Sequence, residues 1–322
     1  MAGVEHGSSF GHDAVLYASE DQFLSAAVPF VQQGVDTGEV VLVSVDPVST
    51  ELLRAELPDD PLVRIGDQSV YTRPTSTLME FQRMFSQERV NGASGVRALG
   101  TVALGGQQEW RGWMRFECLV NHAFSKLPFR ALCAYDVTVL APEIAEGVRR
   151  SHRGLHVGAE YTPDNPEYVA PADFMGLTEY APRANPLETE PPALDVPDLV
   201  DLYVLRLDVN LATTVGTYLD RRAVTDFGYA VSEVARNALN HGEPPVRVRV
   251  WTSLTEAHCA VSDQGSGNPD PLSGYRRVYA GGDGREKLGL WAARHLCDEL
   301  EYGFDADGFT VRLSVRRPQR PD

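Results

Sequence analysis

The stretch that decides the fold of the C-terminal half is SEVARNALNH, residues 232–241. It lies within residues 224–240, where apolar residues recur at three- and four-residue steps, which predicts one buried face of a helix. On that helix Glu233 and Asn237 lie one turn apart on a common face. A carboxylate there can accept a proton from a hydroxyl, and an amide oxygen can bind Mg²⁺. Taken alone, the pair is explained more simply by the solvated face of an amphipathic helix.

A second block, VSDQGSG at residues 261–267, follows that helix. Alternating valines predict a strand at residues 245–251, and a second strand at 259–261 leads to Asp263. A carboxylate at a strand end can accept the amine of adenine. Gly265 and Gly267 have no Cβ to keep the backbone away from a base and ribose. Glycine-rich turns are common, so this block is informative only because of its position after the first.

The third block is KLGLW, residues 287–291. The polar, glycine-rich residues 273–286 before it predict a loop, and the apolar spacing after it predicts a helix opened by Gly289. Backbone N–H groups at a helix start can hold phosphates, with the loop as a lid. Residues 308–315 alternate as a strand that places Thr310 near its beginning. The three blocks in this order predict an ATP site.

These blocks resemble the GHKL superfamily of Bergerat-fold ATPases over residues 198–316, and within it the serine-kinase type of anti-sigma factor. The resemblance implies an α/β sandwich in which Glu233 is the general base, Asn237 holds Mg²⁺ and Asp263 reads adenine. The set predicted to bind the nucleotide is Asn237, Asn240, Asp263, Gly265, Gly267, Lys287, Gly289, Leu290 and Thr310.

One feature departs from that family pattern. Its members carry an arginine in the first helix that can reach the γ-phosphate, whereas residues 211–215 here read LATTV. Such an arginine can be worth about 10³–10⁵ in rate. The sequence therefore leaves two functions open, phosphotransfer to a protein and an ATP-gated switch without catalysis.

Composition bounds the other function classes. With 322 residues and 43% hydrophobic content, the chain is expected to form about two domains. Its formal charge of −16 argues against direct nucleic-acid binding. The four cysteines show no zinc or disulfide spacing, residues 1–10 resemble no export signal, and no stretch is long enough to span a membrane. A cytoplasmic protein without membrane association is expected.

The first half reads as an α/β domain. Strand-like residues 14–17 and 40–45 flank a helical pattern at 21–35, and strands at 96–100 and 131–135 flank another at 110–124. This alternation predicts a parallel sheet covered by helices. No Gly-x₄-Gly-Lys-Ser/Thr loop follows either early strand, so no phosphate site is predicted there.

Several residues of this half resemble the MEDS sensory domain, a RecA-like or KaiC-like module without a working P-loop, over residues 10–180. The resemblance rests on 12–17, 113–121 and 132–136 followed by His152, and it implies a site for a small-molecule signal. The candidate sensory residues are His12, Trp113, Glu117 and His152. Structural roles for these side chains remain open, and their separation in sequence predicts no metal site.

Residues 181–197 are rich in proline and acids, which predicts an extended interdomain linker. No heptad hairpin with a phosphoacceptor histidine is present, which argues against an autophosphorylating histidine kinase. A small-molecule enzyme is also disfavoured, because the first half shows no nucleophile and base pair. The resemblance implies control of a sigma factor or an anti-sigma-factor antagonist, and a homodimer is left open.

Overall fold

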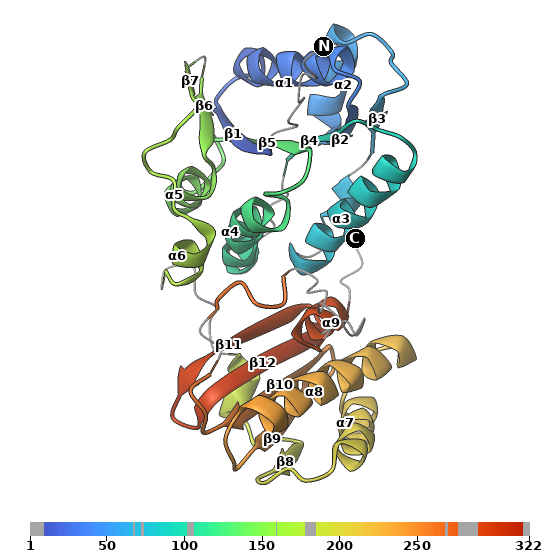
Figure 1. Cartoon of the computed structure of the whole chain (residues 1–322), viewed down its shortest axis with the longest axis vertical. Coiled ribbons are helices and arrows are strands. Elements are labelled where there is room, and N and C mark those ends of the chain that lie inside the picture. The colour runs from blue at the N-terminus through green and yellow to red at the C-terminus, as the bar shows by residue number, and fades with distance from the viewer. Residues whose placement is uncertain are drawn as a thin grey trace, which may run out of the picture. The chain divides into compact units, whose positions relative to one another are not determined.

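The computed structural model describes residues 10–66, 68–71, 74–101, 106–158, 160–177, 185–267, 270–275 and 289–317 (Figure 1). The chain divides into two compact units, 1–181 and 182–322. None of the helices in the described ranges is long and apolar enough to cross a membrane.

The N-terminal unit is built around a sheet with the strand order β3-β2-β4-β5-β1-β6-β7. Neighbouring strands are parallel except β7, which is antiparallel to β6. The strands are β1 (Gly11–Tyr17), β2 (Val40–Ser44), β3 (Val63–Ile65), β4 (Val96–Gly100), β5 (Phe129–Asp136), β6 (Gly154–Val157) and β7 (Glu160–Thr162). The helices are α1 (Glu20–Asp36), α2 (Pro47–Glu56), η1 (Gln68–Val70), α3 (Pro74–Val90), α4 (Gly106–Ala123), α5 (Pro142–Ser151) and α6 (Pro171–Met175).

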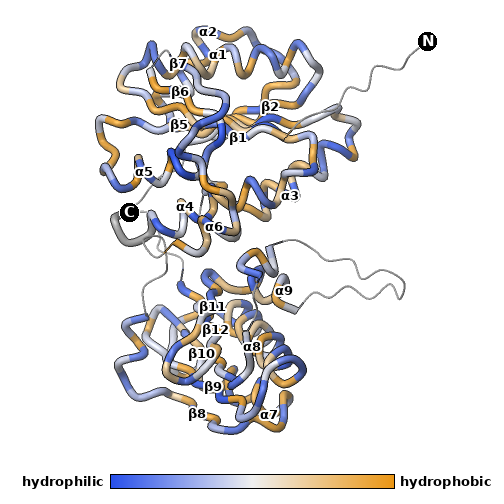
Figure 2. Tube along the Cα trace, turned by 60° about the vertical axis from the view of Figure 1, so that its left-hand side comes forward, coloured by the Kyte–Doolittle hydropathy of each residue, from blue (hydrophilic) through white to orange (hydrophobic). Residues whose placement is uncertain are grey.

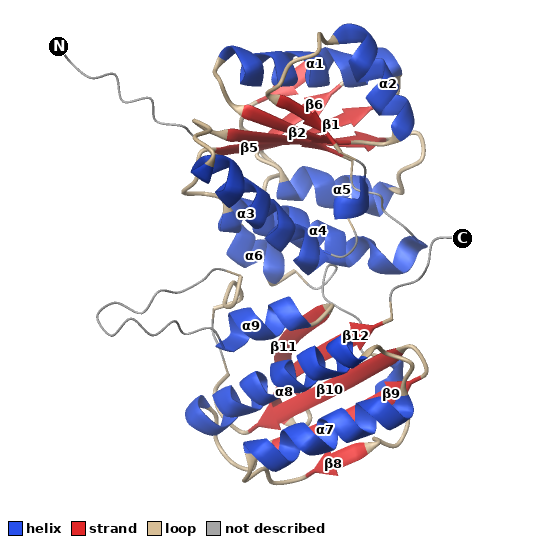
Figure 3. Cartoon of the chain, turned by 90° about the vertical axis from the view of Figure 1, so that its right-hand side faces the viewer, coloured by secondary structure: helices blue, strands red, loops and turns tan. Residues whose placement is uncertain are grey.

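Helices cover both faces of this sheet. Helices α1 and α2 lie on one face, and α3 to α6 lie on the other (Figure 3). Parallel strands buried on both faces need continuous apolar runs, and Figure 2 shows hydrophobic residues along the central strands. Under α1, Phe23 and Val31 pack with Val15 and Leu132 of the sheet. The predicted parallel α/β sheet is confirmed.

The C-terminal unit is an antiparallel sheet with the order β11-β12-β10-β9-β8, and helices α7, α8 and α9 lie on one face of it (Figure 3). The strands are β8 (Leu194–Val196), β9 (Arg247–Ser253), β10 (Glu256–Asp263), β11 (Glu299–Asp305) and β12 (Gly308–Arg316), and the helices are η3 (Pro186–Thr189), α7 (Leu202–Gly216), α8 (Arg221–His241) and α9 (Gly289–Leu296). The predicted helices and strands of this half are present, which confirms a sheet covered by helices.

Helix α8 is the central helix of that layer. Asp220 caps it by accepting a hydrogen bond from Ala223 N at 2.8 Å. Its buried face includes Phe227, Val231 and Val234, which pack on the apolar side chains of β9 and β10. The spacing that predicted the helix is therefore the spacing of its buried face.

The expected linker differs in the structure. Strand β8, within residues 181–197, pairs with β9, and η3 packs on the sheet through Glu188. Glu188 accepts hydrogen bonds from Arg312 Nε at 2.7 Å and lies 2.9 Å from His258 Nε2. The composition of residues 181–197 predicted a segment that stays extended in solvent. Instead, strand β9 pairs with the backbone of β8, and His258 and Arg312 bind Glu188. Residues 185–196 thus belong to the C-terminal unit.

Candidate functional site

Helix α8 brings Asn237, the candidate Mg²⁺ ligand, close to Gly289, where the candidate phosphate site begins. Asn237 lies on the polar side of α8, and Gly289 begins α9. A Cβ atom added to Gly289 would lie 3.1 Å from both amide atoms of Asn237. The absence of that Cβ lets the start of α9 approach the amide closely, so residues 52 positions apart in sequence form one surface.

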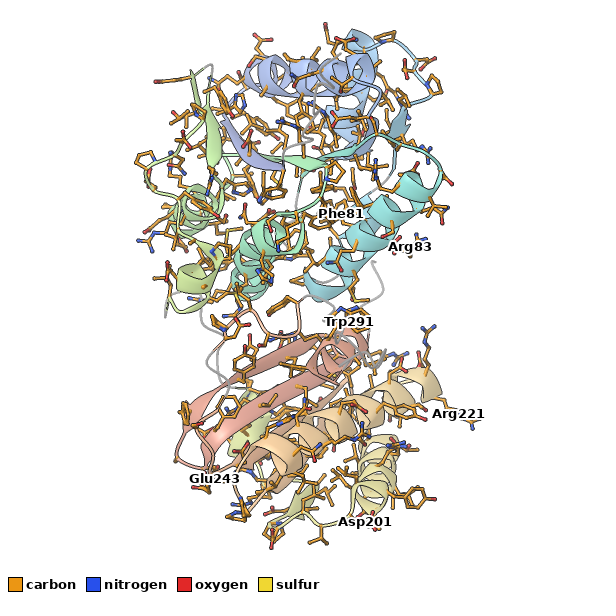
Figure 4. All side chains as sticks on the ribbon, in the orientation of Figure 1. Phe81, Arg83, Asp201, Arg221, Glu243 and Trp291 are labelled. Atoms are coloured by element: carbon orange, nitrogen blue, oxygen red, sulfur yellow. The ribbon has the colours of Figure 1, made fainter. Side chains whose placement is uncertain are left out.

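Asp263, the adenine candidate, ends β10 beside the C-terminal end of α8. Its Oδ1 accepts hydrogen bonds from Gly265 N at 2.8 Å and from Glu243 N at 3.4 Å. A Cβ on Gly242 would lie 2.4 Å from Asp263 Cγ. Glu243 follows α8 at the end opposite Arg221 (Figure 4). Two glycines therefore leave room for this buried carboxylate and orient it.

Thr310, one of the residues predicted to bind the nucleotide, lies on the other face of the sheet from Asp263. Its Oγ1 hydrogen-bonds to Ser262 Oγ and Asp305 Oδ1, each at 3.0 Å. Ser262 and Thr310 are directly paired across β10 and β12, so both face away from the side that Asp263 shares with α8. Phe309 is paired with Asp263 instead, and a Cβ on Gly267 would lie 2.5 Å from its ring. Thr310 therefore points away from Asp263, the residue predicted to bind adenine.

Glu233, the general-base candidate, is half-buried and paired. Arg236 Nη1 donates to its two carboxylate oxygens at 2.7 and 2.9 Å. Asn240 is exposed on the last turn of α8, and Leu290 packs against the core beneath α9. Lys287 lies outside the described residues.

Arg294 is a residue of this region that the sequence analysis did not single out. It is buried in α9, and its Nη1 donates to Tyr275 Oη at 2.8 Å and to Leu300 O at 2.7 Å. Its Nε donates to Ser273 O at 3.2 Å. The arginine therefore ties α9 to residues 270–275, which include the start of the predicted lid, whereas residues 276–286 of the lid lie outside the described residues. The position of Arg294 within an otherwise apolar helical pattern is the sequence feature that could have identified it.

In the N-terminal unit, three of the four candidate sensory residues meet. His12 Nε2 lies 3.1 Å from Glu117 Oε2, and His152 Nε2 lies 3.4 Å from the same oxygen. Cys133, which the sequence analysis did not include, places its Sγ 3.4 Å from both His12 Nε2 and Glu117 Oε2. All four side chains are buried between the sheet and helices α4 and α5. Trp113 packs instead on the rings of Tyr71 and Phe116.

The environment shifts the ionisation of this cluster. Burial opposes a charge on Glu117, but His12 and His152 beside it outweigh burial and hold its pKa well below the usual range. Burial lowers the pKa of His12, and nearby His152 lowers it further. Burial and then Glu117 raise the pKa of the Cys133 thiol. The low pKa of Glu117 places an ionised carboxylate within this buried cluster.

Among the described residues of this unit, hollows lie at two places relevant to ligand binding. A cavity of about 20 Å³ is lined by His12, Glu117 and Cys133 on one side and by aromatic residues including Tyr71 and Phe81 on the other. A hollow of about 240 Å³ lies beside α2 and β3, lined by residues 53–65 and Val43. The second is the larger space for a small molecule.

Two family models match the chain where these two sites lie. Residues 11–153 match the MEthanogen/methylotroph, DcmR Sensory domain, abbreviated MEDS. Residues 200–315 match the histidine kinase-like ATPase domain. No curated protein matches the chain in a sequence comparison. The chain carries a MEDS sensory domain followed by a histidine kinase-like ATPase domain, and this combination fits a signalling regulator.

Proposed function

We propose that the C-terminal domain binds Mg·ATP in a Bergerat-type fold and that the N-terminal domain, a RecA- or KaiC-like sheet, senses a signal. The observation that carries the proposal is the close approach of Asn237 to Gly289, together with the oriented carboxylate of Asp263. A Cβ on Gly289, Gly242 or Gly265 would crowd these side chains. The residues fit a nucleotide, with the amide of Asn237 as an Mg²⁺ ligand and the start of α9 as the phosphate site.

The partner is a sigma factor or an anti-sigma-factor antagonist. An apolar stripe at four-residue spacing supports binding of a protein, since Tyr203, Leu207, Leu211 and Val215 of α7 are between 51% and 79% exposed. Leucine and valine side chains this exposed on one helical face are typical of an interaction surface. The cytoplasm is the compartment that such a partner implies.

Phosphotransfer to a serine or threonine of the antagonist is the leading activity. ATP supplies the phosphoryl group, and Glu233 accepts the proton of the acceptor hydroxyl. Glu233 must first leave Arg236, and a partly exposed ion pair of this kind contributes only about 0–1 kcal/mol. The pair is therefore no obstacle to catalysis.

A non-catalytic switch, in which ATP orders the lid and gates partner binding, is the alternative. The position of Arg206, the arginine of α7, supports this alternative. Its Nε donates to Ser232 Oγ at 3.1 Å, and its guanidinium stacks on Tyr229 at 4.6 Å. These contacts hold the guanidinium against α8.

The substitution Glu233→Ala distinguishes the two activities when the variant is assayed with labelled ATP and purified candidate antagonists. A kinase loses transfer while keeping ATP affinity, whereas a switch keeps both ATP affinity and ATP-dependent partner binding. Arg236→Ala is the matched control, because it removes the salt bridge and leaves the base. Absence of ATP binding by the wild-type protein would refute both activities.

A further inference from the structure

Four buried side chains that can bind metal come together from four elements of the N-terminal unit. They are His12 of β1, Glu117 of α4, Cys133 of β5 and His152 directly after α5, and one ligand atom of each lies within 4.8 Å of the others. The geometry points to a binding site for one zinc ion. This inference goes beyond the proposed function and does not depend on ATP binding.

The hydrogen bonds around His12 determine which of its nitrogens is free. Asn121 Nδ2 donates to Ser151 O at 2.7 Å and to Glu117 O at 3.3 Å, so the amide oxygen of Asn121 is an acceptor. His12 Nδ1 lies 3.3 Å from that oxygen and must donate to it. With Nδ1 occupied by this hydrogen bond, Nε2 is the nitrogen of His12 that faces Glu117 and Cys133.

His152 is oriented in the same way. Its Nδ1 lies 2.8 Å from the carbonyl oxygen of Val148, which can only accept, so Nδ1 carries the hydrogen. Its fully buried Nε2 has no hydrogen-bond partner among the described residues, although it lies 3.4 Å from Glu117 Oε2. The other oxygen of Glu117 accepts from Tyr135 Oη at 2.6 Å. Nε2 of His12 and Nε2 of His152 thus both lie beside Oε2 of Glu117.

A single proton cannot satisfy this arrangement. A proton shared by His12 and Glu117 would leave the buried Nε2 of His152 without a hydrogen-bond partner among the described residues, at a cost of about 1–3 kcal/mol. A metal ion at the centre would instead accept electron pairs from all four atoms. The closest pairs of ligand atoms are 3.1–3.4 Å apart. Around one tetrahedral zinc ion such atoms are about 3.3–3.7 Å apart.

Charge and donor type favour zinc. Zinc binds imidazole, thiolate and carboxylate in four-coordinate sites. When the Zn–S bond forms, the proton of Cys133 leaves to solvent, and the 2+ ion, thiolate and carboxylate then sum to zero charge. The buried cluster becomes neutral, which removes the cost of a lone buried carboxylate.

The surroundings also suit an ion. Metal-bound histidines usually donate their second N–H to a carbonyl or carboxylate, and here Asn121 and Val148 supply the acceptors. The adjoining cavity of about 20 Å³ holds about one water molecule. It has no room for an organic signal molecule, so the polar cluster itself fits an ion. A bound ion would hold α4 and the end of α5 against β1 and β5.

The test uses the full-length protein, stripped with a chelator and then titrated with Zn²⁺ or with Co²⁺ as a spectroscopic probe. Elemental analysis after dialysis should find one metal per chain, and Co²⁺ should show a thiolate charge-transfer band. Cys133→Ser should lose that band, and His152→Gln should weaken zinc binding at least about tenfold. Cys118→Ser is the matched control, because this buried thiol contacts Pro171 O outside the cluster. It should keep the band.

Lack of stoichiometric metal binding would overturn the inference and leave a protonated histidine–carboxylate cluster. A band that survives Cys133→Ser, or one that disappears in Cys118→Ser, would also overturn it by placing the metal elsewhere. If Cys133→Ser does not fold, the wild-type protein decides, because cobalt without a thiolate band contradicts the site. An ATP titration of the same preparation tests the C-terminal domain separately.

Discussion

Gly242→Ala should weaken ATP binding although alanine would not contact the nucleotide. The added Cβ would lie 2.4 Å from Asp263 Cγ, 2.5 Å from its Oδ1 and 2.7 Å from Ala238 O. The Ala238 carbonyl is helix backbone and accepts the Gly242 N–H at 2.8 Å, so it cannot yield easily. The carboxylate of Asp263 must therefore move by about 1 Å to reach ordinary contact distance.

The size of the effect follows from the hydrogen bonds of that carboxylate. Its displacement breaks the 2.8 Å bond from Gly265 N and misaligns the oxygen that would accept from adenine. A hydrogen bond to a charged group contributes about 1.5–3 kcal/mol, which corresponds to about a 10- to 150-fold loss of affinity. The overpacking itself costs about 1–3 kcal/mol of folding stability.

Calorimetric titration of the full chain with Mg·ATP measures the affinity, and a thermal melt checks folding. Gly303→Ala is the matched control in the same unit, because its added Cβ meets nothing within 4 Å. A folded Gly242→Ala protein that binds ATP as tightly as Gly303→Ala would refute the role of Asp263.

Three further changes test other parts of the C-terminal domain. Asn237→Ala should abolish the difference in ATP affinity measured with and without Mg²⁺, and an unchanged difference would exclude it as the ligand. Arg294→Leu should lower the melting temperature and speed proteolysis near residues 270–275, because Tyr275 loses its buried partner; equal cleavage rates would contradict this anchoring role. Burial opposes ionisation of Glu188, but hydrogen bonds from His258 and Arg312 lower its pKa to about 2. A carboxylate whose pKa is lower in the folded than in the unfolded protein stabilises the fold at pH values above its unfolded pKa. This stability is lost as the pH falls from about 4.5 to about 2. Glu188→Gln should flatten acid unfolding in that window, and an unchanged profile would count against the interaction.

Local patterning predicted most of the elements. The helix α8 and the strand β9 follow from apolar patterns among residues only a few positions apart, so the sequence alone predicts them. The family resemblance implied separate roles for Asn237 and Gly289 at one nucleotide site, and the structure brings the two residues close together. The face taken by Thr310 was not predictable, because one residue of register between β10 and β12 reverses it.

The linker shows where composition misled. Proline and acidic residues predicted an extended segment, yet β8 completes an edge of the sheet and Glu188 meets two basic side chains. A composition argument counts the polar groups of a segment but not the partners that another segment offers. The segment boundary therefore depended on the fold.

By itself, the sequence determined the alternation of helices and strands, the two domains and the order of the blocks predicted to bind a nucleotide, because these depend on local periodicity and on motif spacing. The tertiary structure alone decided that His12, Glu117, Cys133 and His152 share one buried point. These residues span 140 positions, and no local interaction relates them. Only the order of the parallel strands and the packing of α4 and α5 bring their lone pairs together.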